Sequence, residues 1–499
     1  MKSILKYLLF VLCVSVFPAG ATASVPGPQK APLKYDFESM KSRIDEKSLP
    51  LVNISVDIAS VTRDYYTQAS IEIVDPLMRT DGNLSVTYDC KVKYRGATST
   101  RYQKKSFAVK LLNEKGKSLD ANILGIREDD SWILDAMAID RIRMRNRVNF
   151  DTWNAMSRTP YDTKYDGRNG TLGFFVEVFV NGDYHGLYCM TDKVNRKLLG
   201  VDKAKEDADG KPIINGVMYK CAEWGDASYF KGYNMWQDMN GESWNAWELD
   251  YPDDYPCETA YMPLKNFLDY CIYTTDEEYE AGLDENVYID NFVDYHVFVL
   301  SQGLCDNTMK NSFLSIVNIN DGHRMMITPW DLDTSLGGFW EGSYNDVVAY
   351  NETVLQVWAF ERLWYLKDYG YQTMVADRWR TLRNTVLSDE AMFARLDDYA
   401  SRFIESGAWA REYNKWNGNP VPLKENLMEE VEYAKKWYAN NAVNMENVIF
   451  YGIESGIAAP GVSDNAPADG NVYNVMGQKV APGFRGIVVR NGKKYFNAR

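Results

Sequence analysis

The sequence predicts an α+β protein in which a strand-rich first part is followed by a helix-rich second part, an order compatible with two lobes. Between residues 51 and 112, short runs rich in β-branched and aromatic residues are separated by turn residues. Between residues 353 and 450, apolar residues recur at helical spacing. The composition, 45% hydrophobic and 14% aromatic, supplies a large core and excludes a disordered or coiled-coil protein.

The first part begins with four predicted strands, at residues 51–56, 69–74, 84–94 and 106–112. Helical spacing then predicts a helix over 132–157, with arginines between its apolar positions. A strand pair follows at 174–180 and 185–190. It is joined by Asn181-Gly182, because both residues tolerate the positive φ of a tight hairpin turn.

The second part begins after a Trp- and Tyr-rich insertion at 202–262, whose periodicity is weak. A buried helix is predicted at 284–304, and strands at 312–319 and 323–328. The helical patterns that follow include 378–386 and 423–438.

The two ends of the chain read as processing or accessory segments. Two lysines precede an apolar run at 8–17, and small residues follow at 21–23, which predicts a signal peptide over 1–23. We therefore expect export to the periplasm, the cell surface or the medium. No later stretch approaches the roughly 20 apolar residues of a membrane-spanning helix. The remaining predicted boundaries are a linker at 24–49, a main domain at 50–452, a linker at 453–470 and a short β-like tail at 471–499. The tail resembles C-terminal sorting segments of exported Gram-negative proteins.

Charge and rare residues exclude several classes of function. A net charge of −14 argues against a nucleic-acid binder or a basic membrane-surface protein. With three histidines, a multi-histidine zinc site is a poor expectation. The six cysteines after the predicted signal peptide form no CxxC pair, so the sequence leaves disulfides and buried thiols both open.

The first chemical motif is a carboxylate followed five residues later by an amide, Asp306 and Asn311, just before a predicted strand. Phosphoryl transfer uses a carboxylate to orient the attacking hydroxyl and accept its proton, and an oxygen ligand nearby to hold a metal ion. The spacing DxxxxN is that of a kinase catalytic loop. A capped turn is the alternative interpretation of the same residues.

A second acidic motif follows the strand predicted at 323–328. Asp331 and Asp333 lie at its end, where a carboxylate that binds the metal ion of a phosphotransferase would be expected. Two alternatives are turn capping and a phosphatase-like DxDxS motif in which Asp331 attacks phosphate. The phosphatase alternative needs a Rossmann-like alternation of strands and helices, which the surrounding pattern lacks.

Candidate phosphate-binding cations lie upstream. The strand at 106–110 has Ala108 and Lys110 on one face, as in the VAIK strand of kinases. Lys104 and Lys105 compete with Lys110 for the same role. A Gly-rich loop is missing, since the segment that starts with Arg95 has one glycine, and Arg95 is the candidate to grip phosphate there.

Taken in order, five sequence windows resemble the CotH kinase-like family, an atypical branch of secretory protein kinases. The windows, spread over roughly residues 50–450, are Tyr94-Arg95-Gly96 with Ser99 and Lys104-Lys105-Ser106-Phe107; Asp140 with Arg145-Asn146; Val176-Glu177-Val178-Phe179-Val180-Asn181-Gly182 through Gly186-Leu187-Tyr188 and Thr191-Asp192-Lys193-Val194; Asp306-Asn307 with Lys310-Asn311; and Pro329-Trp330-Asp331-Leu332-Asp333.

The resemblance implies a divergent bilobal protein-kinase-like fold, with a strand-rich N-terminal lobe and a helix-rich C-terminal lobe. It also implies ATP with Mg²⁺ or Mn²⁺, and phosphorylation of Ser or Thr on exported proteins. The roles it implies are Asp306 as catalytic aspartate, Asp331 as metal-binding aspartate, Asn311 as metal-side amide, Lys105 or Lys110 as nucleotide lysine, and Asp333 and Arg95 as further metal and nucleotide candidates.

The sequence also departs from the family pattern. Leu304 stands where many members carry an Asn two residues before the aspartate, and the insertion at 202–262 does not align. A second hypothesis therefore keeps the fold without the catalysis: a surface adhesin or structural binding module whose aromatic side chains contact glycans or proteins.

Overall fold

The structure is a computed structural model that describes residues 35–322, 324–454, 472–474, 479–480, 486–490 and 493–497. The predicted signal peptide, part of each predicted linker and part of the tail lie outside these residues. Within the described part of the first linker, the short helix α1 (Phe37–Lys41) packs the buried Phe37 ring against Phe179.

Seven strands of the first part close into a barrel, in the order β1-β2-β3-β4-β7-β9-β8. Strand β8 closes the barrel by pairing with β1 in parallel, and every other neighbouring pair is antiparallel. Closure leaves no unpaired strand edge. The strands are β1 (Leu51–Val56), β2 (Thr67–Val74), β3 (Ser85–Arg95), β4 (Ser106–Leu112), β7 (Ser131–Asp135), β8 (Gly173–Val180) and β9 (Asp183–Asp192).

Alternation along the strands separates the barrel interior from its outer face. Val92, Val109 and Leu134 belong to a core of their own inside the barrel. Lys93, whose Cα pairs with that of Ala108 on the next strand, lies on the outer face. The hairpin predicted across Asn181-Gly182 is confirmed as β8 and β9.

The single helix predicted at 132–157 is wrong. Its first residues form β7, with Trp132 and Leu134 in the barrel core, and helix α2 (Arg145–Met156) begins only after a loop. The Asp140 carboxylate caps this start by accepting hydrogen bonds from the backbone N–H groups of Met144 and Arg145, both at 2.7 Å.

The second part contains a five-stranded antiparallel sheet in the order β13-β14-β12-β15-β16. Three of its strands come from the 202–262 insertion, whose weak periodicity hid them. The strands are β12 (Val217–Cys221), β13 (Ser243–Trp244), β14 (Trp247–Tyr251), β15 (Ser312–Ile316) and β16 (Met326–Pro329).

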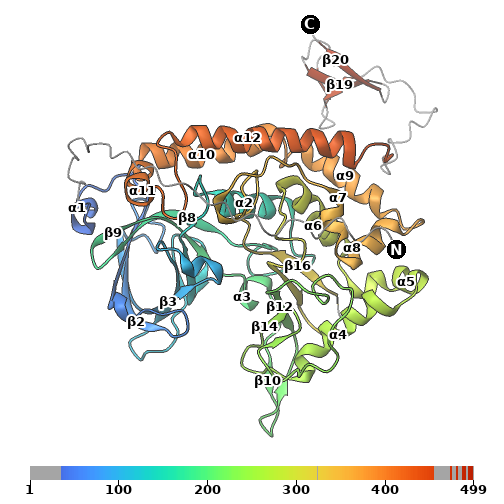
Figure 1. Cartoon of the computed structure of the whole chain (residues 1–499), viewed down its shortest axis with the longest axis horizontal. Helices are drawn as coiled ribbons and strands as arrows, with labels where there is room; N and C mark the ends of the chain where they lie inside the picture. The colour runs from blue at the N-terminus through green and yellow to red at the C-terminus, as the bar shows by residue number, and fades with distance from the viewer. Residues whose placement is uncertain are drawn as a thin grey trace, which may run out of the picture. The chain divides into compact units, whose positions relative to one another are not determined.

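Helices surround this sheet and share with it and α2 the largest hydrophobic core (Figure 1). The helix predicted at 284–304 is instead two helices, because the chain between them pairs Val287 with Met325 in a β-bridge. The helices are α4 (Glu258–Tyr273), α5 (Asp276–Asn286), α6 (Ile289–Gln302), α7 (Asn351–Leu355), α8 (Trp358–Tyr365), α9 (Tyr371–Arg383), α10 (Asp389–Glu405), α11 (Ala408–Trp416) and α12 (Leu427–Asn444).

The remaining described elements are short. They are α3 (Arg196–Leu199), β5 (Ala121–Asn122), β6 (Glu128–Asp129), β10 (Lys205–Glu206), β11 (Pro212–Ile213), the single turns Ile58–Ser60, Thr98–Arg101, Trp340–Gly342 and Met445–Ile449, and the tail sheet of β17 (Val472–Asn474), β18 (Lys479–Val480), β19 (Gly486–Arg490) and β20 (Lys493–Asn497).

The structure shows the state of the cysteines, which the sequence left open, and the character of the described helices. All six cysteines from Cys90 to Cys305 are free thiols. Among the residues that the structure describes, no helix has the length and apolar character needed to cross a membrane.

A buried ionic cluster fastens α11 to the barrel, where this helix lies against β9 (Figure 1). Oε1 of Glu412 accepts hydrogen bonds from Lys104 Nζ at 2.6 Å and from Arg143 Nε at 2.8 Å, and all three side chains are fully buried. Its Oε2 accepts the backbone N–H of Leu187 on β9 at 2.8 Å. One carboxylate therefore pairs with two buried basic side chains and ties the helix to the barrel wall.

We expect Glu412→Gln to lower the free energy of unfolding by about 3–5 kcal/mol, because two buried cations lose their carboxylate. Urea unfolding measures the change. The control Glu128→Gln removes a carboxylate from the exposed pair with Lys164 and should leave the midpoint unchanged. Equal midpoints for Glu412→Gln and the wild type would contradict a contribution of this cluster to the stability of the fold.

Candidate functional site

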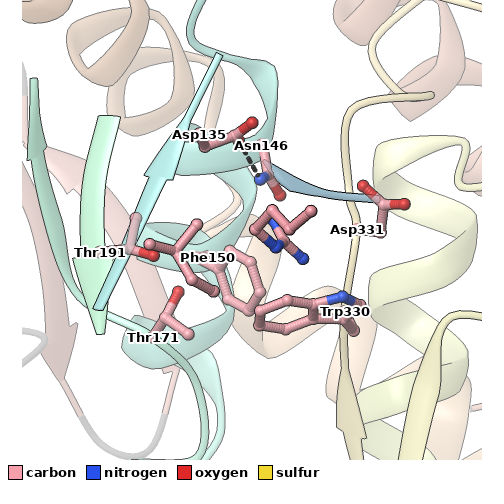
Figure 2. A pocket seen from close by; sticks show the side chains of 9 residues that line it. Asp135, Asn146, Phe150, Thr171, Thr191, Trp330 and Asp331 are labelled. Carbon is pink, nitrogen blue, oxygen red and sulfur yellow. Dashed lines mark hydrogen bonds between the residues drawn. The ribbon is translucent and has the colours of Figure 1, made fainter. Parts of the chain in front are cut away.

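A cavity separates the outer face of the barrel from the loop that follows β16. It encloses about 300 Å³ of space free of protein atoms, part of it open to solvent. Figure 2 shows Asp135 and Asn146 on one side and Trp330 and Asp331 on the other. The lining residues are Arg95, Ile133, Asp135, Asn146, Phe150, Thr171, Thr191, Trp330 and Asp331.

Asp306 lies in the loop between α6 and β15 and is held by two neighbours. Its Oδ2 accepts hydrogen bonds from Lys310 Nζ at 3.0 Å and from Asn311 Nδ2 at 2.8 Å. The Asp306 side chain is 14% exposed, so the carboxylate stays accessible while its orientation is fixed. These are contacts with side chains rather than the backbone N–H groups of a capped turn, and they leave part of the carboxylate free.

The Asp306 loop is joined to the Asp331 segment by a buried amide. Asn307 Nδ2 donates to the backbone carbonyl of Trp330 at 2.6 Å, and the Trp330 N–H donates to the Asn311 carbonyl at 2.8 Å. Asn311 and Asp331 both have positive φ, 59° and 57°. Asn and Asp tolerate this conformation better than other residues with a side chain, which suits their presence at these two corners.

A second amide joins the Asp331 segment to the barrel. Asn146 Nδ2 donates to Asp135 Oδ2 at 2.9 Å (Figure 2). Asn146 Oδ1 accepts the Leu332 N–H at 3.0 Å. Leu332 separates Asp331 from Asp333 in the sequence. Asn146 therefore fixes both acidic residues relative to β7.

Carboxylates outnumber cations at this junction. Asp331 is exposed to solvent at the cavity, and Asp333 is partly buried. Protein atoms around the Asp331 carboxylate still desolvate it and raise its pKa, and the charges of Asp135 and Asp306 add to the shift while Arg95 opposes it. Burial, followed by the charge of Asp331, raises the pKa of Asp333 well above its ordinary value.

The predicted cations have separate positions. Arg95 lines the cavity, with its guanidinium carbon 5.3 Å from the centre of the Trp330 ring. Lys105 donates to the carbonyls of Thr100 and Tyr102, at 2.6 and 2.9 Å, and so stabilises its own loop.

Lys104 and Lys110 lie away from the Asp331 segment. Lys104 belongs to the Glu412 cluster, and its burial lowers its pKa to about 7. Lys110 lies on the outer barrel face, four residues along β4 from Ser106, which is about 13 Å. Its ammonium is 6.0 Å from the centre of the Tyr66 ring. Of the predicted nucleotide ligands, Arg95 alone lines the cavity.

Oxygen atoms at the cavity suit a hard cation such as Mg²⁺ or Mn²⁺. The part of the chain that the structure describes shows no hydrogen bond or ion pair to the carboxylates of Asp331 and Asp333. These carboxylates and that of Asp306 are not within 4.8 Å of one another as a group. Mg²⁺ commonly takes one or two carboxylates and completes its shell with phosphate and water, so the donor set fits.

Asp120, Asp129 and Asp130 form the acidic group whose oxygens do lie within 4.8 Å. Asp129 pairs with Arg127 at 2.6 Å, and Asp120 pairs with Lys197 at 2.5 Å. These cations already neutralise much of the group.

Sequence reasoning gave no role to Asp135, Asn146, Asn307 or Trp330. Asp135 was hidden inside the wrongly predicted helix. Asn146, Asn307 and Trp330 belong to the windows that carry the family resemblance, which was the available signal. The phosphatase alternative for Asp331 is not supported, because the sheet that ends at β16 is antiparallel rather than Rossmann-like.

Comparison with known proteins gives one match. The family model described as CotH kinase protein matches residues 92–445. A search of curated proteins finds no match. The matched range includes Arg95, the Asp306 loop and the Asp331 segment.

We expect Asp333→Asn, measured without divalent cations, to raise the urea midpoint of unfolding more at pH 8 than at pH 5. A raised folded-state pKa means that ionising Asp333 costs stability as the pH rises above the unfolded value of about 3.9. The neutral amide avoids that cost. Asp64→Asn, at an exposed position outside the site, is the control and should show no such pH dependence. A midpoint below that of the wild type at pH 8 would contradict the assigned charge excess.

Proposed function

The chain belongs to the CotH kinase protein family, and from this premise we propose that it is an exported atypical protein kinase. It transfers the γ-phosphoryl group of ATP to Ser or Thr hydroxyls of secreted or surface proteins. The single observation that carries this proposal is the junction of Asp306 with the Asp331 segment, held together by Asn307 beside a cavity that contains Arg95.

The barrel and the helical part correspond, in this proposal, to the two lobes of a divergent kinase-like fold. Each has its own hydrophobic core, and the cavity lies where the barrel meets α2 and the loop after β16. The closed barrel differs from an open lobe sheet, so the correspondence rests on position rather than strand order.

Nucleotide binding is proposed over the outer barrel face. On this face, residues paired across neighbouring strands form three rows. Arg95 and Ser106 form the row at the Asp331 end. Lys93, Ala108 and Ile133 form the next row, and Lys91 and Lys110 belong to the farthest one. In this proposal the base would contact the small, partly exposed Ala108 and the apolar Ile133, which lines the cavity, and Arg95 offers a planar fork for phosphate. Lys110 belongs to the far row and would contact a different part of the ligand from Arg95.

A bound divalent cation would neutralise charge on the phosphates and link them to the protein. Asp331 is the principal carboxylate for it, with the Oδ1 of Asn311 as a further donor, while Asp333 would hold a cation on the other side of Leu332, in the second cavity that it lines. The excess negative charge at these residues supports this assignment, since a cation would offset the cost that raises both carboxyl pKa values.

Asp306 is the proposed catalytic residue in the transfer step. The acceptor hydroxyl oxygen forms a bond to the γ-phosphorus, the bond from that phosphorus to the β,γ-bridging oxygen breaks, and ADP leaves with that electron pair. The hydroxyl proton passes to the Asp306 carboxylate. Lys310 and Asn311 hold Asp306 in one orientation during this step.

The alternative of a non-catalytic surface binding module is favoured by one observation. Within the 202–262 insertion, Trp236 is 88% exposed and Met235 is 62% exposed. Exposed aromatic side chains of this kind suit glycan or protein contacts. Absence of nucleotide binding, together with loss of glycan or protein binding in Trp236→Ala, would favour the module.

We expect Asp306→Asn to lower kcat for transfer of γ-phosphate to a Ser-rich protein acceptor by about 10²–10⁴-fold, with the KM for ATP nearly unchanged. Asp331→Asn should instead raise the Mn²⁺ concentration needed for half-maximal rate as well as lowering kcat. Radiolabel transfer from ATP measures both.

The matched control is Asp120→Asn, which removes a carboxylate from the acidic group outside the site and should transfer at the wild-type rate. Undiminished labelling by Asp306→Asn and Asp331→Asn would refute the residue roles.

A further inference from the structure

A second cavity lies on the other side of the acidic segment. It contains about 240 Å³ of space free of protein atoms, part of it open to solvent. Asp333 lines this cavity, whereas Asp331 lines the first. Its polar and charged lining residues are Asp140, Arg141, Arg145, Asp333, Ser343 and Tyr344. The two acidic residues on either side of Leu332 thus line different cavities.

Arg145 presents unused hydrogen-bond donors in this region. Its side chain is 2% exposed, and Nη1 donates to Asp140 Oδ1 at 2.5 Å. Nε and Nη2 are buried and have no hydrogen-bond partner. These two nitrogens form the edge of a guanidinium that binds two oxygens of one carboxylate or phosphate in parallel. Leaving both donors buried and unpaired is costly, which points to a ligand.

No side chain of the described cavity lining fills this role. Asp333 also lines the cavity, but Arg145 and Asp333 form no ion pair within 4.0 Å. Arg141 is already engaged, since its Nε donates to the Gly342 carbonyl at 2.6 Å and its Nη1 to the Pro422 carbonyl at 2.9 Å.

Gly338 places backbone, with no side chain, beside the guanidinium edge. A Cβ at this position would lie 2.8 Å from Arg145 Nε and 3.1 Å from Cζ, closer than nonbonded atoms normally approach. A larger residue would therefore have to displace the guanidinium. The glycine lets the backbone pass beside Arg145 without a side chain in the cavity.

We propose that the Nε and Nη2 edge of Arg145 binds a phosphate-class oxyanion in this second cavity. A phosphate dianion has oxygens spaced for a parallel pair of N–H donors. Its charge suits a cavity that is lined by the guanidinium groups of both Arg141 and Arg145. A divalent cation on Asp333 would offset the repulsion between that carboxylate and the anion. The source of the phosphate rests on the proposed function, which would place a newly formed phosphoserine or phosphothreonine here; the alternative source is free phosphate.

Calorimetric titration without ATP tests the binding. The wild-type chain is titrated with inorganic phosphate and, separately, with a phosphoserine peptide, each at 1 mM Mg²⁺ and constant ionic strength. We expect binding of at least one probe, and about tenfold or greater weakening in Arg145→Lys, which keeps the charge and loses the parallel donors. Tighter binding of the peptide identifies the product as the source, and tighter binding of inorganic phosphate identifies free phosphate.

Two further variants separate ligand binding from folding. Gly338→Ala keeps Arg145 paired with Asp140 but crowds the free edge, and should weaken binding as Arg145→Lys does. Arg411→Lys alters a guanidinium whose fork is already occupied by Glu177, at 2.7 Å for both contacts, and should bind the probe as the wild type does. Circular dichroism confirms that each variant is folded.

Equal affinity in the wild type and in both folded cavity variants, or no binding of either probe by the wild type, would overturn the proposal. Because no nucleotide is present, failure of kinase activity leaves this result unaffected. Conversely, a kinase that binds neither probe would retain the proposed function and lose only the oxyanion site.

Discussion

The side-chain amide of Asn146 is the contact on which the site depends. Its nitrogen donates to Asp135 on the barrel, and its oxygen accepts the Leu332 N–H between the two acidic residues. Since Asn146 lies in the first turn of α2, three separate parts of the chain meet at one planar group. An amide can donate and accept at once, whereas a carboxylate could not donate to Asp135. The need to donate one hydrogen bond and accept another explains why this residue is an asparagine.

Around that amide the protein concentrates negative charge and holds it in place with neutral contacts. Asn307 and Asn146 fix the loops through backbone groups, so the carboxylates of Asp331 and Asp333 are not consumed by the scaffold. The large buried cations are used elsewhere, as in the Glu412 cluster that joins α11 to the barrel. This arrangement raises the carboxyl pKa values of Asp331 and Asp333, and perturbed pKa values cluster at functional sites. Structural stability and the proposed cation binding are thus assigned to different groups of residues.

The sequence could predict the parts of the fold that local patterns determine. The strand at 106–112 and the hairpin across Asn181-Gly182 were predicted because alternation and turn chemistry act within a few residues. The helix predicted at 132–157 failed because β7 is a five-residue strand whose place is decided by its barrel neighbours β4 and β9. Strand β12 of the insertion was missed for the same reason, since its partners β14 and β15 lie far along the chain, whereas β13 is only two residues long.

For the site, motif spacing located Asp306 and Asp331, and the structure brings their loops together through Asn307. Spacing could not reveal that Lys105 is occupied by loop carbonyls, or that Asp333 and Asp331 line different cavities, because both facts depend on side-chain contacts made in three dimensions. It also could not place Asp135, which reaches the cavity only because the barrel closes.

The most direct test of a metal-dependent nucleotide site at Asp331 is a calorimetric titration of the full chain with ATP, with and without Mn²⁺. The account predicts binding that requires Mn²⁺ and that weakens by about tenfold or more in Asp331→Asn, since a carboxylate ligand to the metal is lost. Binding of equal strength without Mn²⁺, or unchanged Mn²⁺-dependent binding in Asp331→Asn, would contradict it.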